Sequence, residues 1–251
     1  MATAAGARRA VIFGANTDVG KTVVSCGLVR AACGALTNGG VAYVKPLQTG
    51  AEHGHSDERA VRRAVAAAGL EQRLRSATLY SWGPAVSAHV AAEAGPAITA
   101  EGVEDGVPSD HDVCARISAY LDAHADAELS FVETAGGVLS PGPARTMQAD
   151  MYAGLKLPVM LVGDGRLGGI SSTICAVESL RQRGYEIPAL AILEDPDEGY
   201  GNTEYLQYKL GDSMRIFGFG ALPPEPEPLD EWHAEAQPQF EAIVEHLMKH
   251  L

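Results

Sequence analysis

The stretch Gly14-Ala15-Asn16-Thr17-Asp18-Val19-Gly20-Lys21-Thr22 decides the fold of this 251-residue chain. The apolar run Ala10 to Phe13 comes before it and predicts a buried strand, and the segment Val23 to Ala32 after it predicts a helix. A glycine-rich turn between a strand and a helix, ending in Gly-Lys-Thr, is typical of a phosphate-binding loop. In such a loop, backbone N–H groups and the positive end of the helix dipole face phosphate oxygens.

The spacing of this loop differs from the common pattern. Ala15 stands where the common pattern has glycine, and the glycine comes one residue earlier, at Gly14. A chance Gly-Lys-Thr at an ordinary helix start is the alternative, and the flanking strand and helix argue against it. We expect Lys21 to reach the β- and γ-phosphates and Thr22 to offer its hydroxyl to Mg²⁺. The expected nucleotide-binding residues of the loop are Asn16, Thr17, Asp18, Val19, Gly20, Lys21 and Thr22.

The composition is that of a globular protein, with 46% hydrophobic and 20% charged residues. The length suits one α/β domain, and we expect residues 1–251 to form it. No apolar run approaches the length of a membrane span, so no membrane partner is expected. The formal net charge of −13 argues against a nucleic-acid partner, because the phosphate backbone would be repelled.

The cysteines and the first residues bear on the cellular compartment. Four widely spaced cysteines, all within predicted helices, include no C-x-x-C, so we expect reduced thiols in a soluble intracellular protein and no metal site formed by cysteines. The segment Met1 to Ala10 holds two arginines and several alanines. It is too short for a signal peptide, and it is compatible with the remnant of a removed transit sequence.

Short apolar strand patterns alternate with helix patterns along the chain. This alternation predicts an open, mainly parallel sheet with helices on both faces and a ligand site at the C-terminal edge of the strands. We expect residues 96–108 to form a surface loop and the proline-rich segment 223–228 an exposed connector. The predicted strands are 10–13, 41–44, 77–80, 129–132, 157–162, 187–193 and 215–219, and the predicted helices are 23–32, 58–68, 87–93, 110–124, 170–183 and a C-terminal helix with an apolar face from Phe240 to Leu251.

Two charged residues are expected at this edge of the sheet, and a third opens the helix that follows the first of them. Pro46 should stop the strand after Lys45, and Glu133 should terminate the strand 129–132. The small residues after Glu133 allow close backbone approach to a ligand, which suits a Mg²⁺ ligand. Asp57 opens a helix, where Ser56 or Asp57 is a natural N-cap. The alternatives are a solvated lysine, a surface glutamate and a helix cap.

A second glycine-rich turn follows the strand 157–162. It runs from Gly163 to Gly169 and leads into the helix 170–183. The N-terminus of a helix offers unpaired N–H groups and a positive dipole end, so this turn is a second candidate anion site.

Taken together, these motifs resemble dethiobiotin synthetase of the biotin pathway. The family has the same G-x5-G-K-T loop, a Lys-Pro-x-x-Ser/Thr-Gly strand end, here Lys45 to Gly50, and a Glu-x-Ala-Gly-Gly, here Glu133 to Gly137. An Asp that starts the next helix, here Asp57, completes the pattern. The runs 133–143 and 162–171 are most similar to the eukaryotic form, in which this domain is fused ahead of an aminotransferase. That form would place the chain in the mitochondrial matrix; otherwise the cytoplasm is expected.

The resemblance implies a reaction and roles for named residues. ATP, CO₂ or bicarbonate, and 7,8-diaminononanoate (7,8-diaminopelargonate) are the expected partners. A carbamate forms, ATP phosphorylates it to a carbamic-phosphoric anhydride, and the second amine closes the ring. The implied catalytic residues are Lys21, Lys45 and Thr17, and the implied ligands of the cofactor Mg²⁺ are Thr22, Asp57 and Glu133. The implied substrate-binding residues are Thr17, Lys45, Thr49, Gly136 and Gly137, with Gly168, Gly169, Ile170 and Ser171 contributed by the partner subunit of a homodimer.

Two positions depart from the family pattern. Ala88 precedes His89 where the family usually has proline. The adenine-recognising Asn of the family follows the strand matched here by 189–193, but Glu194 and Asp195 stand there and Asn202 comes later. Asn202 is therefore the candidate for the base, and poor discrimination between nucleotides is expected.

Two other functions compete with this interpretation. Related amidotransferase-like synthetases carry a glutaminase domain with a nucleophilic Cys, for which the chain has no room. A P-loop switch ATPase that recruits partners usually has a second lysine inside the loop or a membrane-targeting tail. Here position 16 is Asn16, and Glu241 and Glu245 make the last helix a poor membrane anchor.

Overall fold

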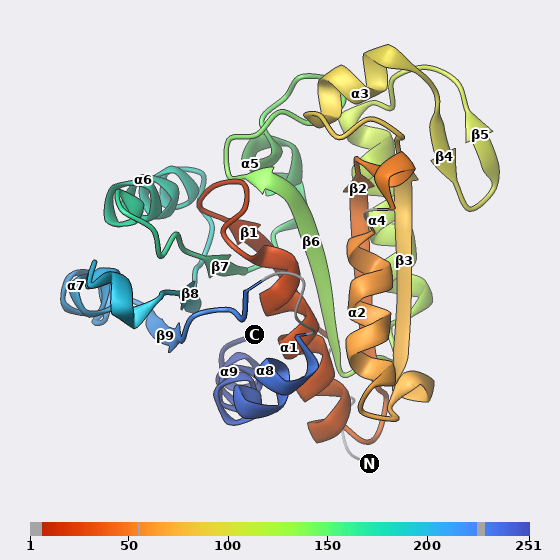
Figure 1. The fold of residues 1–251 in the computed structure, drawn as a ribbon. Helices are drawn as coiled ribbons and strands as arrows, with labels where there is room; N and C mark the ends of the chain where they lie inside the picture. Colours follow the sequence, from red (N-terminus) through yellow and green to blue (C-terminus); the bar gives the residue numbers. More distant parts are fainter. Residues whose placement is uncertain (1–6, 55, 225–228) are drawn as a thin grey trace.

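The computed structural model describes residues 7–54, 56–224 and 229–251. Most of the segment considered as a transit remnant and most of the connector 223–228 lie outside these ranges. Within them, one sheet of nine strands has the order β5-β4-β3-β2-β6-β1-β7-β8-β9 (Figure 1). Its strands are β1 (Arg8–Gly14), β2 (Val41–Gln48), β3 (Leu74–Ser81), β4 (Ala97–Thr99), β5 (Gly102–Glu104), β6 (Leu129–Gly137), β7 (Val159–Val162), β8 (Ala189–Leu193) and β9 (Arg215–Phe219).

The strands β3, β2, β6, β1, β7, β8 and β9 run parallel to one another, and the pairs β3–β4 and β4–β5 are antiparallel. Parallel neighbours need crossover connections, and helices supply them here. The helices are α1 (Lys21–Ala35), α2 (Asp57–Ala66), α3 (Ala88–Ala94), α4 (Asp110–Ala123), α5 (Gln148–Met151), α6 (Gly169–Gln182), α7 (Asn202–Leu210), α8 (Asp230–Glu235) and α9 (Gln237–His250). Short 3₁₀ turns occupy Ala51–His53, Glu71–Arg73, Tyr152–Leu155 and Pro196–Glu198.

Two hydrophobic clusters lie on the two faces of the sheet. One packs α1, α2 and α9 against it, and the other packs α3, α4, α5, α6 and α7. The expected apolar face of α9 is buried through Phe240, Ile243, Val244 and Leu247. The prediction of a mainly parallel sheet covered on both faces is therefore confirmed, and the C-terminal edge of its central strands carries the loop between β1 and α1 (Figure 1).

The predicted end of one central strand is wrong. Pro46 does not end β2: the pairing with β6 stops at Val44, but pairing with β3 continues to Gln48. A proline removes one donor on one side of a strand, so it interrupts one ladder and spares the other.

Two other local predictions are also wrong. Glu133 does not terminate β6, which runs on to Gly137 beside β1. The segment expected as a surface loop, 96–108, contains the hairpin of β4 and β5.

The start of α2 and the positions of the cysteines match the sequence predictions. The side chain of Ser56 accepts a hydrogen bond from the backbone N–H of Arg59, so Ser56 is the N-cap and Asp57 the first residue of α2. The four cysteines are free and lie in helices. Within the described residues, no helix is both long and apolar enough to cross a membrane.

Candidate active site

The loop between β1 and α1 wraps around the side chain of Lys21. Lys21 is buried, and its Nζ lies 3.4 Å from the carbonyl oxygen of Asn16, within the loop. A Cβ on Gly14 would lie only 2.9 Å from both Cδ and Nζ of Lys21. The same Cβ would lie 2.9 Å from the backbone carbonyl oxygen of Asn16, which cannot move aside as a lysine side chain can, so the loop favours glycine at position 14.

The remaining loop residues are arranged around the start of α1. Asn16, Thr17 and Asp18 are exposed, whereas Val19 is buried. Gly20 is the N-cap of α1 with φ of 84°, and a Cβ there would meet Leu193 at 2.1 Å. The first amides of α1 consequently have no side-chain cap, as expected for an anion-binding helix start.

Lys45 lies between two carboxylates, beside this loop. Its Nζ is 2.5 Å from Asp57 Oδ2 and 2.9 Å from Glu133 Oε1, and it donates to the carbonyl oxygen of Thr134 at 2.9 Å. Only 3% of the Lys45 side chain and none of the Glu133 side chain is exposed. A buried ion cluster of this kind persists only when every charge has a partner.

The charges of the cluster shift the proton affinities of its members. Burial alone would lower the pKa of Lys45, but the carboxylates of Glu133 and Asp57 outweigh it and raise that pKa. Burial alone would raise the pKa of Asp57, but Lys45 outweighs it and holds that pKa below its usual value. In contrast, burial, and after it the charge of Lys45, lowers the pKa of Lys21 to about 8. A phosphate anion next to Lys21 would favour its charged form.

Oxygen atoms that suit Mg²⁺ gather at the same point. Thr22 Oγ1 donates to Glu133 Oε1 at 3.3 Å, and Asp57 lies across Lys45 from Glu133. Two ligands of one Mg²⁺ lie no more than about 4.2 Å apart, so Thr22 and Glu133 are close enough to share a cation. The described residues contain no group of three or more His, Cys, Asp or Glu side chains arranged for a metal. This oxygen set therefore fits a Mg²⁺ that is also bound by phosphates and water.

Two adjoining cavities open over these groups. One, of about 430 Å³, is lined by Lys21, Thr22, Lys45 and Asp57. The other, of about 530 Å³, extends toward α3 along Val86, Ser87 and Ala88. Residues shared by both cavities include Thr17, Asp18, Thr49 and Gly136. Gly137 lies behind them, and its N–H donates to Ser140 Oγ at 2.8 Å.

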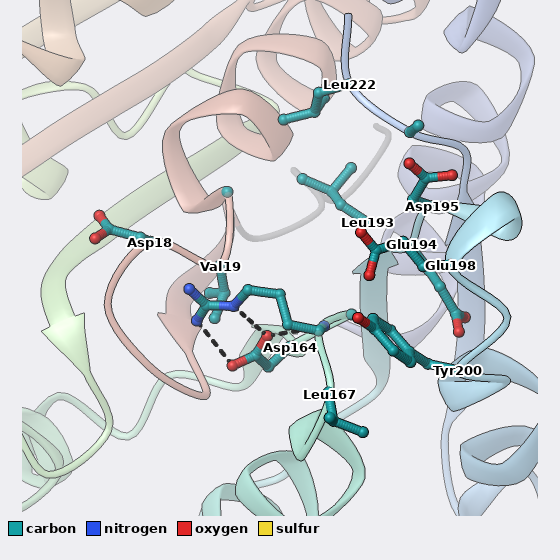
Figure 2. Close-up of a pocket in the computed structure, with 14 residues that line it drawn as sticks. Asp18, Val19, Asp164, Leu167, Leu193, Glu194, Asp195, Glu198, Tyr200 and Leu222 are labelled. Atoms are coloured by element: carbon teal, nitrogen blue, oxygen red, sulfur yellow. Dashed lines mark hydrogen bonds and ion pairs between the residues drawn. The ribbon is translucent and has the colours of Figure 1, made fainter. Parts of the chain in front are cut away.

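A third cavity, of about 600 Å³, lies on the other side of the loop (Figure 2). Asp18 and Val19 border it on the loop side, and Glu194, Asp195 and Tyr200 lie opposite. This cavity lies between the phosphate loop and the segment after β8.

Asn202, the candidate for the base, is buried under this cavity. Its Nδ2 donates to the carbonyl oxygens of Asp164 at 3.1 Å and of Arg166 at 2.8 Å. These bonds hold the second glycine-rich turn. Glu194 in turn accepts from the backbone N–H groups of Asn202 and Thr203, at 2.7 and 2.8 Å.

The residues expected to bind substrate at the second glycine-rich turn line neither the cavity that Lys21 and Lys45 share nor the cavity that adjoins it. Gly168, Gly169, Ile170 and Ser171 are absent from the residues that line those two cavities. Gly169 is buried, Ile170 is half-buried and Ser171 is exposed at the start of α6. The chain by itself thus brings together Thr17, Lys21, Thr22, Lys45, Thr49, Asp57, Glu133 and Gly136. It leaves Gly168, Gly169, Ile170 and Ser171 apart, although Arg166 of the same turn donates to the carbonyl oxygen of Thr17 at 3.4 Å.

Three supporting side chains were missed by the sequence analysis. Tyr43 donates to Glu133 Oε2 at 2.8 Å. Gln48 accepts from the backbone N–H of Asp57 at 2.9 Å, and the amide of Gln148 bonds the backbone N–H and carbonyl of Ala135. Tyr43 was detectable, because residues two apart in a strand share a face and Tyr43 precedes Lys45 by two.

Comparisons with known proteins agree with this geometry. A family model described as an AAA domain matches residues 8–228. An ATP-dependent dethiobiotin synthetase of Phenylobacterium zucineum is 33% identical over 189 residues, which cover 75% of this chain and 77% of that protein. The chain belongs to the dethiobiotin synthetase family. A bifunctional dethiobiotin synthetase/7,8-diamino-pelargonic acid aminotransferase, mitochondrial, of Oryza sativa is 34% identical over 94% of this chain and 33% of that protein.

Two further facts qualify these similarities. The chain spans about a quarter to a third of the length of the bifunctional relatives, 26% to 34%. Among solved structures, the MinC:MinD cell division protein complex of Aquifex aeolicus superposes with a TM-score of 0.53 at 12% identity, covering 97% of this chain and 95% of that chain. That likeness shows a shared fold, the P-loop NTPase-type sheet expected from the sequence.

Proposed function

We propose that the chain closes 7,8-diaminononanoate with CO₂ to dethiobiotin, consuming ATP and releasing ADP and phosphate. Membership of the dethiobiotin synthetase family supports the activity, and one observation carries the chemistry. Lys21, on the phosphate loop, and Lys45, on β2, line the same cavity with Thr17 and Thr49. Two cations in one cavity suit a step in which two anions, a carbamate and the γ-phosphate, must approach each other.

The proposed sequence of bonds is simple. One amine of the substrate attacks CO₂ and loses a proton, which gives a carbamate. A carbamate oxygen then attacks the γ-phosphorus, and ADP leaves. The second amine attacks the carbamate carbon and loses a proton, and phosphate leaves as the five-membered urea closes. Positioning and charge neutralisation supply most of the rate enhancement in phosphoryl transfer, and Lys21, Lys45 and Thr17 are the proposed catalytic residues.

Mg²⁺ is proposed to bind Thr22, Asp57 and Glu133 and to neutralise charge on the phosphates when bound. Thr22 and Asp57 line the cavity, whereas Glu133 lies behind Thr22 and Lys45 with its side chain fully buried. Glu133 therefore reaches a cation in the cavity only when the ammonium of Lys45 turns away, toward the substrate. Such a turn would also bring Lys45 nearer the reacting carbamate.

The substrate's far carboxylate is proposed to bind Gly168, Gly169, Ile170 and Ser171 of a partner subunit in a homodimer. Two observations support this arrangement. The turn is separate from the cavities that would hold the amines, and Ser171 at the start of α6 is exposed. Thr49, Gly136 and Gly137 are proposed to contact the amine end beside Lys45.

The base of ATP is proposed to occupy the cavity bordered by Asp18, Val19 and Tyr200 (Figure 2). Because both amide hydrogens of Asn202 are directed at backbone carbonyls, Asn202 contributes there by holding the turn. The name of the rice relative supports a mitochondrial location, which stays a proposal for this chain. No nucleic-acid or membrane partner is proposed.

Turnover assays test this function against the alternative of a P-loop switch ATPase. ADP release is measured with ATP and Mg²⁺, alone and with diaminononanoate and bicarbonate, and dethiobiotin is sought by mass spectrometry. We expect ADP release to require both co-substrates and to match dethiobiotin formed, mole for mole. ADP release at the same rate without them would favour the switch ATPase.

A further inference from the structure

The phenol of Tyr43 forms a hydrogen bond with the carboxylate of Glu133 on its side that faces the protein core. Tyr43 lies in β2 opposite Phe131 of β6, and Glu133 comes two residues later on β6, on the same face of the sheet. The Tyr43 hydroxyl donates to Glu133 Oε2 at 2.8 Å, and the tyrosine ring is fully buried. This contact lies inside the protein, and Tyr43 lines neither of the two adjoining cavities beside the phosphate loop.

The two oxygens of Glu133 are thereby given different partners. Oε2 faces the core and accepts from Tyr43, whereas Oε1 accepts from Lys45 at 2.9 Å and from Thr22 at 3.3 Å. A carboxylate with no exposed surface needs a donor at each oxygen, since an unpaired buried oxygen is costly. Without Tyr43 the carboxylate could rotate to share one donor between both oxygens, and Oε1 would lose its fixed direction toward Thr22.

We infer that Tyr43 is a positioning residue of the metal site: it fixes the plane of the Glu133 carboxylate so that Oε1 faces the nucleotide loop. This inference rests on the metal role proposed for Glu133. Groups that hold metal-binding side chains in place commonly contribute 10–100-fold to metal affinity. Tyr43 acts through Glu133 and touches neither nucleotide nor substrate.

The chain contains a matched control. Tyr80 in β3 is also fully buried, but its hydroxyl has no hydrogen-bond partner within the described residues. Tyr43→Phe and Tyr80→Phe thus make the same chemical change in two buried rings, one with and one without a partner. Melting temperatures of both variants, measured by circular dichroism, report any general loss of packing.

The test counts bound metal directly. Mn²⁺ is titrated into the protein with saturating ADP, and the free ion is measured by electron paramagnetic resonance; ADP affinity is measured separately in EDTA. We expect Tyr43→Phe to raise the Mn²⁺ dissociation constant about tenfold and to leave metal-free ADP affinity unchanged. Tyr80→Phe should stay within about twofold of the parent. Replacing Tyr43 by 4-aminophenylalanine, which retains a donor at the same place, should restore binding.

The variant Glu133→Gln distinguishes the proposed metal role of Glu133 from the positioning role of Tyr43. If Glu133→Gln weakens Mn²⁺ binding and Tyr43→Phe does not, the positioning role is wrong while the metal role stands. If neither weakens it, the proposed metal role of Glu133 fails and the inference fails with it. Equal losses in Tyr43→Phe and Tyr80→Phe would also overturn it, because they would report packing.

Discussion

The two glycine-rich turns of this molecule have similar backbone conformations at the helix start but carry different side chains. The strands before them, β1 and β7, are hydrogen-bonded neighbours. Gly20 and Gly168 are both N-caps with positive φ, 84° and 88°, and a helix begins at the next residue in each case. Two helix starts of the same kind therefore lie side by side at the C-terminal edge of the sheet.

The difference lies in their side chains. The first turn holds Lys21 over a cavity, beside Lys45. In the second, Asp164 accepts three hydrogen bonds from Arg166, at 2.8, 2.9 and 3.1 Å, and the side chain of Asn202 donates to the carbonyl oxygen of Arg166. Burial alone would raise the pKa of Asp164, but its bonds with Arg166 outweigh this and lower it.

A glycine-rich turn at a helix start is thus a framework, and its side chains decide what it can bind. The first turn, with Lys21 and the adjacent Lys45, offers cations that can bind phosphates. In the second turn the charges of Asp164 and Arg166 neutralise each other, so mainly backbone N–H groups are left to bind a ligand. We therefore expect substitutions at or beside the first turn to lower catalytic activity far more than substitutions at the second turn.

The largest effect is expected from Lys45→Ala. Loss of a preorganised charge next to the reacting groups should lower kcat by about 10²–10³-fold. Nucleotide affinity should change by less than about threefold, since Lys45 lies beside the phosphate loop rather than in it. Steady-state kinetics and calorimetry with a non-hydrolysable ATP analogue measure the two effects. Lys209→Ala, at an exposed lysine of α7, is the control, and a near-normal kcat for Lys45→Ala would rule out the catalytic role.

The second turn is tested by Ser171→Asp. A new negative charge at the proposed carboxylate site should raise the KM for diaminononanoate about tenfold and spare the KM for ATP. Ser171→Asn, neutral and of equal size, is the matched control and should stay near the parent. Gly169 is unsuitable for this test, because a Cβ there would lie 1.9 Å from the carbonyl oxygen of Asp164.

A mixed dimer decides whether that turn acts across an interface. One chain carries Lys21→Ala and the other Ser171→Asp, so one of the two shared sites keeps both intact halves. We expect about half the parent activity per dimer from this pair, whereas each variant alone is impaired. Absence of recovery, or a fully active monomer in sedimentation experiments, would exclude a shared site.

The sequence predicted the central part of the fold because its signals are local. Strand, turn and helix around Lys21 follow from short apolar runs and glycine positions, and the residues at the ends of parallel strands must share one edge. Lys45 and Glu133 were placed together on this basis, and the family resemblance added Asp57; the structure joins the three by contacts of 2.5 and 2.9 Å.

Predictions failed where pairing between distant segments decides the structure. The continuation of β2 past Pro46 depends on β3, and the continuation of β6 to Gly137 depends on β1. The assignment of Asn202 to the base, made from its position in the chain, stays a prediction. The side chain of Asn202 donates to the carbonyl oxygens of Asp164 and Arg166, 38 and 36 residues away, and no local sequence pattern indicates these bonds.

A smaller effect, on stability alone, is expected from Asn202→Ala. Loss of two buried hydrogen bonds should lower the free energy of unfolding by about 1–3 kcal/mol. The preference for ATP over GTP or CTP should not change, and in the parent it should stay below about a hundredfold, or about 2.7 kcal/mol. Urea unfolding and competition assays measure these quantities, with the exposed Asn38→Ala as control. A marked loss of ATP preference in Asn202→Ala would return this residue to a role in base recognition.

The smallest effect concerns His233, which joins α8 to the helix that follows the first turn. Its Nε2 bonds the carbonyl oxygen of Val23 at 3.0 Å, and its side chain is buried. Burial lowers the pKa of His233 below its usual value. As pH falls, the unfolded chain takes up a proton at about pH 6.5, before the native protein does. The contribution to stability is therefore complete above that pH and is lost as pH falls through the lowered native pKa.

His233→Gln retains an N–H donor and does not titrate, so its unfolding free energy should fall less steeply than that of the parent between pH 7.5 and 5.5. The exposed His53→Gln serves as the control and should follow the parent. Urea unfolding at both pH values measures the difference. If the free energy of unfolding falls equally in the parent and in His233→Gln, groups other than His233 cause the loss of stability at low pH. A smaller loss in His233→Gln would show that α8 stabilises α1, the helix that follows the first turn, through the neutral imidazole of His233.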